Sequence, residues 1–544
     1  MATHEVTNQA VQPFGLNTAD YPPIADALFR AGAGDRLPEV LAAGELAGSR
    51  AVVELGDLAE AHPPVLRTHD RYGYRVDEVD YDPAYHRLMR HATDLGLHAA
   101  PWADDAAHPH LVRAAKLLAW GSADAGHLCP ISMTYAVVPA LRHNPDLART
   151  YEARLTARAY DPELAPLDSK KSLMAGMSMT EKQGGSDVRA NTTTATVQAD
   201  GSYRITGHKW FTSAPMSDFF LTLAQTAAGV TCFFVPRVLP DGSRNAIFLQ
   251  RLKDKLGNHS NASSEVEYDN AVGWLVGEEG RGVPTIIEMV NMTRLDCALG
   301  TSTLMRVGVQ QAAFHAANRK AFGAYLIEQP LMRNVLADLA VEAEAATTAS
   351  LWLADLTDRS AADEQTALLR RISLAVSKYY ICKRGPVHAG EALECLGGNG
   401  YVEESRMPRL YREAPLPSVW EGSGNVAALD TLRAISRQPQ VLTVFFDEVK
   451  KASGVDKYLD RTIASLEEQF SDFDSIQYRA RGVVGMMAKA LHGSLLLRFG
   501  HSAVAEAYTQ TRLAPDWGDV FGTLPTGVDV GSIIERVTPK ASAA

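Results

Sequence analysis

The 544-residue sequence contains few cysteines, no excess of positive charge and no long apolar run. Its five cysteines lie far apart without a CxxC pair, which favours reduced thiols and predicts neither disulfides nor a zinc site. The formal net charge of -11 argues against nonspecific binding to nucleic acid or membrane surfaces, although a local basic patch is compatible with an acidic total. The first residues lack a signal-peptide pattern, and no uncharged apolar run is long enough to span a membrane. These absences predict a cytoplasmic protein.

The chain also lacks the alternating strands and helices of a dinucleotide-binding sheet. The glycine clusters "GAGD" at 32–35 and "GGNG" at 397–400 have no preceding strand, so neither is a dinucleotide fingerprint. Five histidines lie close together in the sequence, at His86, His91, His98, His108 and His110. Their spacing fits no ligand pattern. We therefore expect neither a Rossmann sheet nor a metal site.

What the sequence does contain is a hydrophobic period that changes along the chain. An apolar fraction of 46% in a chain of this length can supply several cores. Residues 1–180 have mostly helical spacing and predict an N-terminal α domain. Residues 181–283 contain short β-type segments separated by Gly, Asp and Asn turns, and predict a β domain. The helical period returns over 284–440, which predicts a bundle, and continues over 441–544, which predicts a C-terminal helical extension.

The segment "MSMTEKQGGSDVRANTTTA" at 177–195 is the most specific stretch of the chain. Its glycines let backbone N–H groups approach a ligand, and Thr180 and Ser186 supply hydroxyl groups. The alternative is a Gly-Gly hairpin stabilised by Ser and Asp. In the following "GHKWFTSA", Trp210 and Thr212 alternate with Phe211 and are expected to face one side of a strand. The tryptophan suits either a core position or a cofactor contact.

A carboxylate stands near the end of the predicted bundle. The stretch "SVWEGSGN" at 418–425 places Glu421 between a tryptophan and two glycines, just before the helical run "VAALDTLRAISR". Taken alone, Glu421 is either a solvated loop carboxylate or a catalytic base. The rest of the chain decides between these interpretations.

The segments quoted above, taken in their order along the chain, resemble the acyl-CoA dehydrogenase family. The β domain of that family carries a "MTEPxAGSD" stretch followed by "K.WIT". Further matches are "RKAFGAYLIEQPL" at 319–331, "LGGNGYVEE" at 396–404 and "WEGSGN" at 420–425. Together with "LCPISMTYA", "RLKDKLGN", "MTRLDCALG" and "PRLYRE", they are similar to the AidB-like, alkylation-response subgroup. The resemblance implies an α+β fold with an N-terminal α domain, a middle β-barrel domain, a four-helix bundle and an extra helical domain. It also implies a homotetramer.

The resemblance implies FAD as the cofactor. The positions that match cofactor contacts of the family are Met179, Thr180, Gly185, Ser186, Trp210, Phe211 and Thr212 in the β domain, Arg319, Phe322 and Gln329 across a subunit interface, and Gly422, Ser423 and Asn425 after the catalytic loop. Asn425 is also expected to cap a helix, whose N-terminus would attract the pyrophosphate. One position departs from the pattern: Glu394 stands where the family usually has Gln, and an ionised Glu cannot donate a hydrogen bond.

The same resemblance implies a mechanism, in which a carboxylate removes the α proton of an acyl thioester and the flavin takes the β hydride. The backbone N–H of Glu421 and a ribityl hydroxyl are the implied donors to the carbonyl oxygen, where enolate charge develops. Loss of water beneath the flavin would raise the pKa of the carboxylate and strengthen it as a base. Some family members carry the base on the helix residue before an Arg, but that residue is Thr293 here. Glu421 is therefore the predicted catalytic base.

A substrate role is predicted for two residues near this loop. Arg294 and Gly422 match positions at which family members contact the acyl-CoA. For Arg294 the alternative is an ion pair inside the bundle.

Two other functions compete with an FAD-dependent acyl-CoA dehydrogenase-like oxidoreductase. The AidB-like resemblance implies a flavoprotein that acts in alkylation stress by DNA association, with little acyl-CoA turnover. Residues 441–544 carry eleven Lys plus Arg against thirteen Asp plus Glu, whereas a DNA-binding domain is expected to be clearly basic. A flavin monooxygenase on the same fold is disfavoured, because those relatives need no carboxylate at the base position. The dehydrogenase-like function is therefore favoured.

Overall fold

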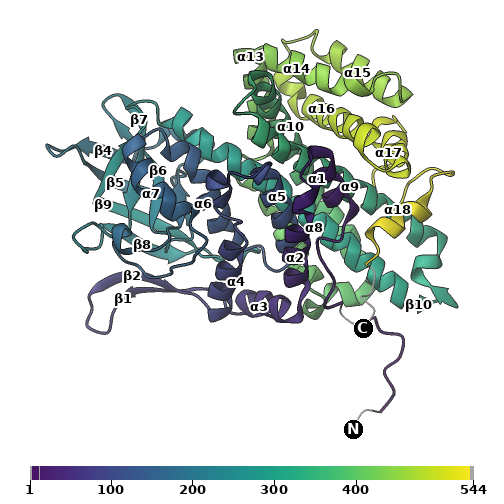
Figure 1. Cartoon of the computed structure of the whole chain (residues 1–544), viewed down its shortest axis with the longest axis horizontal. Helices are drawn as coiled ribbons and strands as arrows, with labels where there is room; N and C mark the ends of the chain where they lie inside the picture. Colours follow the sequence, from purple (N-terminus) through teal and green to yellow (C-terminus); the bar gives the residue numbers. More distant parts are fainter. Residues whose placement is uncertain (1–2, 11–12, 517, 540–544) are drawn as a thin grey trace. The chain divides into compact units, whose positions relative to one another are not determined.

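The computed structural model describes residues 3–10, 13–516 and 518–539, and its chain divides into two compact units. The first unit contains the described residues of 1–50, 110–122 and 294–544. The second contains 51–109 and 123–293, and Figure 1 shows the strands and helices of each. The division falls within the long helix α8 (Gly282–Asn318), which contributes turns to both units.

A seven-stranded sheet forms the centre of the second unit. Its strands are β3 (Ala175–Ser178), β4 (Thr194–Val197), β5 (Tyr203–Ser213), β6 (Phe219–Thr226), β7 (Gly229–Pro236), β8 (Ile247–Leu252) and β9 (Ser263–Val276). They follow the order β3-β6-β4-β5-β9-β7, with β8 on β9. Because β6 also pairs with β7, the strands from β6 to β7 close into a barrel. This confirms the predicted α+β fold with a middle β-barrel, and closure leaves these strands without open edges.

The sheet differs from the sequence prediction at its beginning. Strand β3 starts at Ala175, before the expected boundary at 181, and a hairpin of β1 (Val65–His69) and β2 (Arg75–Asp80) lies in the region predicted as helical. Both differences have a physical reason. Strand β3 has only four residues, so it shows no clear alternation, whereas the hairpin strands are rich in charged residues. The domain boundaries stay predictions.

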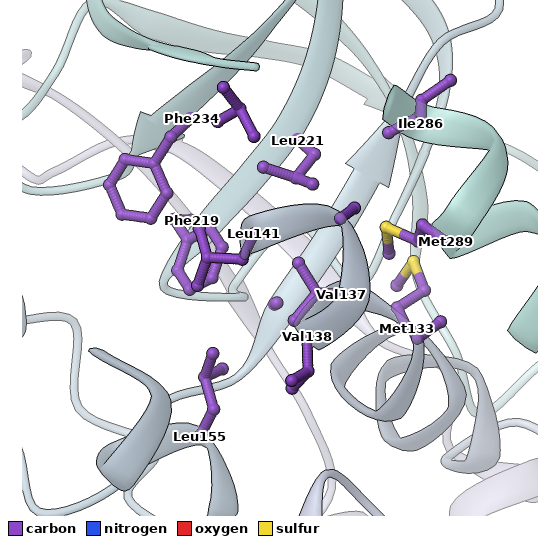
Figure 2. Packing of buried hydrophobic residues seen from close by; sticks show 14 of the residues in the cluster. Met133, Val137, Val138, Leu141, Leu155, Phe219, Leu221, Phe234, Ile286 and Met289 are labelled. Atoms are coloured by element: carbon purple, nitrogen blue, oxygen red, sulfur yellow. The ribbon is translucent and has the colours of Figure 1, made fainter. Parts of the chain in front are cut away.

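Helices cover this sheet with apolar side chains. The helices of the second unit, besides the first turns of α8, are α3 (Arg50–Ala61), α4 (Pro83–Asp94), α6 (Leu128–Leu141) and α7 (Pro145–Thr156). Figure 2 shows Val137 and Leu141 of α6 with Phe219 and Leu221 of β6 in one buried cluster, which Met289 of α8 also joins. Burying each such side chain contributes about 1.5–3 kcal/mol. The cluster thereby fixes β3 and its neighbour β6, and the motif at 177–195 begins in β3.

In the residues that the structure describes, the first unit is built from helices apart from one small hairpin, β10 (Lys320–Ala321) and β11 (Ala324–Tyr325). Its helices, besides the last turns of α8, are α1 (Pro22–Ala31), α2 (Leu37–Gly48), α5 (Pro109–Trp120), α9 (Pro330–Arg359), α10 (Glu364–Glu394), α11 (Met407–Glu413), α12 (Leu416–Val419), α13 (Gly424–Arg437), α14 (Gln440–Val449), α15 (Lys457–Gln469), α16 (Ile476–Phe499), α17 (Ser502–Tyr508) and α18 (Val530–Val537). Among the described residues, no helix is both long and apolar enough to cross a membrane.

Buried ion pairs attach the C-terminal extension to α9. Arg512, fully buried, pairs with Asp338 and Glu342 of α9, and its Nη2 lies 3.0 Å from Glu342 Oε2. Arg384 of α10 binds the same Glu342 oxygen at 3.3 Å. Near the end of the chain, Arg536 Nη2 reaches a carboxylate oxygen of Glu344 at 2.7 Å. The extension is thus held by groups that would be costly to leave buried and unpaired.

The Glu342 site predicts how this attachment responds to acid. Burial raises the pKa of Glu342, but Arg384 and Arg512 outweigh it and lower the pKa from 4.5 to about 2. Because the folded pKa lies below the unfolded one, the carboxylate contributes about 3 kcal/mol of stability above pH 4.5, which is lost as the pH falls towards 2. We expect Glu342→Gln to lower the Tm at neutral pH and to flatten its decline over that window. Parallel Tm profiles for the two proteins would contradict this linkage.

Candidate functional site

Two motifs predicted to hold the flavin meet in the second unit. Thr180 follows β3, and its carbonyl accepts a hydrogen bond from the backbone N–H of Trp210 in β5 at 2.8 Å. The hydroxyl groups of Ser178 and Thr212 also form a hydrogen bond. The structure thus brings Met179 and Thr180 beside Trp210 and Thr212, although the two motifs are far apart in the sequence. Their contact with a flavin stays a prediction.

A fully buried ion pair anchors the first of these motifs. Lys209 Nζ lies 2.8 Å from Glu181 Oε1 and donates to the carbonyl of Leu223 at 2.7 Å. The carboxylate also accepts the backbone N–H of Thr192 at 2.7 Å and that of Thr193 at 3.2 Å. Burial lowers the pKa of Lys209 to about 8. Burial raises the pKa of Glu181, but Lys209 outweighs it and the net shift is strongly downward. The sequence analysis missed this pair, although both residues lie inside the quoted motifs.

The loop between β3 and β4 is a tight glycine turn that leaves its backbone open. Glu181 and Gly184 close the turn by exchanging backbone hydrogen bonds, and Gly184 has a φ of +144°. A Cβ on Gly185 would come within 2.4 Å of Thr180 Oγ1. Gly184, Gly185 and Ser186 are exposed. The tight Gly-Gly turn is therefore present, held by the Glu181–Gly184 backbone bonds, and its exposed backbone is also what a ligand would require.

Trp210 lies in a cationic environment at a break in the β5 pairing. Lys253 Nζ is 3.2 Å from the centroid of its ring, which is partly buried, and the next ring, Phe211, is 51% exposed. The predicted alternation of Trp210 and Thr212 on one face does not hold. The register of β5 with β9 shifts between Lys209 and Thr212, so an extra residue interrupts the period of two.

In the first unit, Glu421 lies between α12 and α13 in a backbone conformation that few non-glycine residues adopt. Its φ is +56°, and that of Gly422 is +96°. The left-handed conformation costs a non-glycine residue about 1–2 kcal/mol. Lys378 Nζ donates to the carbonyls of Trp420 and Gly422, each at 2.6 Å, and Arg294 Nε donates to that of Glu421 at 2.9 Å. Hydrogen bonds to charged groups contribute about 1.5–3 kcal/mol each, which offsets the strain.

Arg294 is itself held in place by a carboxylate. Its Nη1 lies 2.8 Å from Asp430 Oδ2, and Arg371 Nη2 lies 3.0 Å from the other oxygen of Asp430. Burial raises the pKa of Asp430, but the two guanidinium groups outweigh it and keep that pKa below its ordinary value. The ion-pair interpretation of Arg294 is thus correct, and its contact with a substrate stays a prediction. The preceding Thr293 donates its hydroxyl to the Val290 carbonyl at 3.1 Å, within its own helix.

Helix α13 starts earlier than the sequence analysis expected. It begins at Gly424, with Ser423 in the N-cap position, so Asn425 is its second residue. The expectation that Asn425 caps the helix is therefore wrong. The left-handed turn at Gly422 redirects the chain, and helical geometry begins two residues later. Ser423 and Asn425 are both exposed.

The third group of predicted cofactor residues lies on the β10–β11 hairpin and the 3-10 turn after it. Arg319 Nη1 donates to the carbonyl of Asn8 at 2.7 Å, and Gln329 Nε2 donates to that of Ala321 at 3.2 Å. Phe322 is 99% exposed and has a φ of +52°. The three side chains share one short segment, as the motif implied.

The C-terminal extension contacts α10 on both sides of Lys378. His492 Nε2 of α16 lies 3.4 Å from Ser377 Oγ, and Arg481 Nε of α16 donates to the Tyr379 hydroxyl at 3.2 Å. Sequence reasoning missed Lys378, because its bonds join segments that are far apart along the chain. The available signal was a single lysine inside the apolar helical run "LAVSKYYIC".

Several basic side chains of the extension form ion pairs with acidic side chains. Lys450 Nζ lies 2.6 Å from Glu467, and Lys451 Nζ lies 2.6 Å from Glu448, to which Arg498 also binds at 2.8 Å. These pairs reduce the positive charge that the extension can offer to phosphate groups. A salt titration of DNA binding would test the predicted association.

Two of the five histidines form hydrogen bonds within the second unit. His86 Nδ1 lies 2.8 Å from the Tyr160 hydroxyl, and His98 Nε2 lies 2.8 Å from the Ala157 carbonyl. Within the described part of the chain, no three His, Cys, Asp or Glu side chains gather as a metal site would require.

Comparison with known families divides the chain into three matched regions. Residues 8–162 match the adaptive response protein AidB N-terminal domain. Residues 176–271 match the acyl-CoA dehydrogenase middle domain, and residues 280–436 match its C-terminal domain.

Individual relatives match over most of the chain. AidB of Escherichia coli (strain K12) is 44% identical over 517 residues, which cover 94% of each protein. Acyl-CoA dehydrogenase family member 11 of Caenorhabditis elegans is 31% identical and covers 77% of this chain and 70% of its own. The crystal structure of Caenorhabditis elegans ACDH-11 in complex with C11-CoA superposes with a TM-score of 0.84 at 28% identity, covering 94% of this chain and 93% of that one. An acyl-CoA dehydrogenase from Bacillus anthracis complexed with FAD shares the fold, with a TM-score of 0.64, 18% identity and coverage of 84% and 81%.

Proposed function

The chain belongs to the acyl-CoA dehydrogenase family, and on that premise we propose that Glu421 is the base that removes the α proton of an acyl-CoA thioester. The protein is an FAD-dependent acyl-CoA dehydrogenase-like oxidoreductase. The observation that carries the proposal is the geometry of the Glu421 loop. A half-buried carboxylate stands on a left-handed backbone whose neighbouring carbonyls are bound by two buried cations.

The residues of the second unit are compatible with a flavin. The open backbone at Gly185 and Ser186 offers N–H donors, and Thr180 and Thr212 offer hydroxyl groups beside the partly buried ring of Trp210. We assign cofactor contact to these residues and to Met179, Phe211, Arg319, Phe322, Gln329, Gly422, Ser423 and Asn425. When bound, FAD supplies the acceptor for the β hydride.

Glu421 and the residues around it have separate roles in the proposed reaction. The carboxylate takes the α proton, and the Glu421 backbone N–H donates to the thioester carbonyl, where negative charge develops. Gly422 lets the chain turn away at a φ of +96°, which an L side chain would resist. Arg294 uses Nε for the Glu421 carbonyl and Nη1 for Asp430, so its substrate contact is limited to the rest of its guanidinium.

A relative supports the proposed substrate class. ACDH-11 was solved with C11-CoA, and we propose an acyl-CoA of similar length as the substrate of this chain. The test is anaerobic mixing of the FAD-loaded protein with butyryl-, octanoyl-, C11- and palmitoyl-CoA while the flavin absorbance is recorded. We expect rapid bleaching by at least one of them. If none of these acyl-CoAs bleaches the fully FAD-loaded protein, the dehydrogenase proposal is wrong for these substrates.

We further propose a homotetramer, supported by the exposed Phe322 on the hairpin that carries the third group of cofactor residues. A fully exposed aromatic side chain on a left-handed backbone is costly in a monomer and useful at an interface. Phe322→Glu is expected to give smaller assemblies in light scattering and to weaken FAD binding, whereas Val455→Glu, an exposed position in the C-terminal extension, serves as the control. A Phe322→Glu protein of unchanged mass and FAD affinity would contradict this interface.

The alkylation-response alternative rests on the similarity to AidB, and no contact described above favours it over the dehydrogenase reaction. DNA association stays a proposal, to be tested by the salt titration, because phosphate contacts weaken as salt rises. A cytoplasmic location is proposed from the five free thiols.

A further inference from the structure

Lys378 is a fully buried lysine whose ammonium group contacts the backbone on both sides of Glu421. Its side chain comes from the middle of α10 and is 1% exposed. Nζ donates to the Trp420 carbonyl and to the Gly422 carbonyl, each at 2.6 Å. Among the described residues, Lys378 forms no ion pair with a carboxylate, so carbonyl oxygens provide its solvation.

Burying an ammonium without a carboxylate partner is costly, and lysine is among the residues least often fully buried. A lysine with only a packing role is readily replaced by Met or Leu of similar volume. The positions of its two acceptors point to a more specific role, because they flank the residue proposed as the base.

The hydrogen bonds determine the two soft dihedral angles of Glu421. The Trp420 carbonyl belongs to the peptide plane before Glu421, and the Glu421 carbonyl belongs to the plane after it. Lys378 holds the first plane, and Arg294 Nε holds the second at 2.9 Å. Lys378 also holds the plane after Gly422. With these planes fixed, Glu421 keeps its φ of +56°, which it would otherwise leave for a more favourable region.

We propose that Lys378 is a positioning residue that fixes the left-handed backbone of Glu421 and thereby aims its carboxylate at the α carbon of the acyl thioester. This inference rests on the proposed role of Glu421 as the base. Lys378 does not touch the substrate, and it acts only through the loop.

The primary test is Lys378→Met, which keeps the length of the side chain and removes its donors. We expect flavin reduction by a bleaching acyl-CoA to slow by about 10²-fold, the usual effect of misplacing a catalytic group by about 1 Å. The acyl-CoA concentration at half-maximal rate and the FAD affinity should change little. Lys457→Met is the control, because it removes the same charge from the same unit at an exposed position of α15, away from the Glu421 loop. Its rate should match that of the unaltered protein.

A second comparison separates positioning from a general loss of structure. In the Glu421→Gln background, Lys378→Met should cause no further loss, because the group it positions has already been removed. The rate at which the α deuterium of the acyl-CoA exchanges reports proton removal independently of the hydride step. In the Lys378→Met single variant, this exchange rate should fall in parallel with the rate of flavin reduction. An additional loss of the same size in the Glu421→Gln background would overturn the proposal, as would an unchanged rate in Lys378→Met alone.

Two further outcomes are informative. If Lys378→Met does not accumulate as folded protein, Lys378→Gln takes its place in the same comparison, since its uncharged amide nitrogen ends one bond short of the Nζ position. If Glu421→Gln alone leaves the rates of reduction and exchange unchanged, the proposed base is wrong and the role of Lys378 falls with it. If instead Glu421→Gln slows the reaction and Lys378→Met does not, the base proposal stands and only the positioning role of Lys378 is wrong.

Discussion

Glu421→Gln is expected to slow flavin reduction by acyl-CoA by about 10³–10⁴-fold, at the upper end of what general base catalysis contributes. The amide of Gln has nearly the shape of the carboxylate but cannot accept the α proton. Lys378 and Arg294 bind backbone carbonyls rather than the Glu421 side chain, so the loop should keep its conformation in the variant. FAD affinity should therefore remain close to that of the unaltered protein. Anaerobic stopped-flow absorbance measures the rate, and fluorescence titration measures FAD binding.

The control for this variant is Glu468→Gln, which makes the same chemical change at an exposed position of α15. Its reduction rate should match that of the unaltered protein. A Glu421→Gln protein that still reduces its flavin within a factor of about ten would exclude Glu421 as the base, because the smallest usual effect of losing one is about 10²-fold. Loss of FAD in that variant would instead show that the side chain supports the cofactor site.

The second large effect is expected for Lys209→Met in the β-barrel. Removal of one partner from a buried ion pair costs about 3–5 kcal/mol, because the other charge stays buried and uncompensated. Here the remaining carboxylate of Glu181 would keep only its bonds to the loop that follows β3, such as those from Thr192 and Thr193. We expect a lower denaturant midpoint for the barrel and weaker FAD binding. Denaturant unfolding followed by intrinsic fluorescence, together with FAD titration, tests both.

A double variant separates the two consequences. Lys209→Met combined with Glu181→Leu removes both charges, and replacement of a buried pair by apolar groups is often neutral for stability. The double variant should recover much of the lost stability but not the FAD affinity, since the carboxylate bonds that hold the glycine turn are absent. Lys171→Met, at an exposed position, is the control for charge loss in the same unit. Equal FAD affinity in the double variant and the unaltered protein would show that the turn does not depend on Glu181.

Much of the fold could be predicted from local patterns. The long β segments became β5, β6, β7 and β9, and the long helical periods became α9, α10 and α16, because each spans enough residues to show its period. The short strands β3, β4 and β8 and the charged β1–β2 hairpin escaped prediction, since their pairing is set by neighbours rather than by alternation. The start of α13 was misplaced because the left-handed Gly422 has no distinctive spacing.

The candidate site was predictable only where it lies within continuous motifs. Thr180, Trp210 and Glu421 could be found because each stands in a short segment with a recognisable family pattern. Lys378 and Asp430 could not, since their roles arise from tertiary contacts with residues far along the chain. The break at Trp210 likewise depends on the register with β9, which the sequence of β5 alone does not contain.

The contacts of α16 on either side of Lys378 connect the C-terminal extension to the base loop. His492 and Arg481 hydrogen-bond to the two neighbours of the lysine that holds the Glu421 backbone. A displacement of α16 that shifts this turn of α10 would move Lys378 Nζ away from the two carbonyls that it binds. We expect such a displacement to change the rate of proton removal and to leave acyl-CoA affinity nearly unaltered, because reciprocal coupling applies to binding free energies and not to rates.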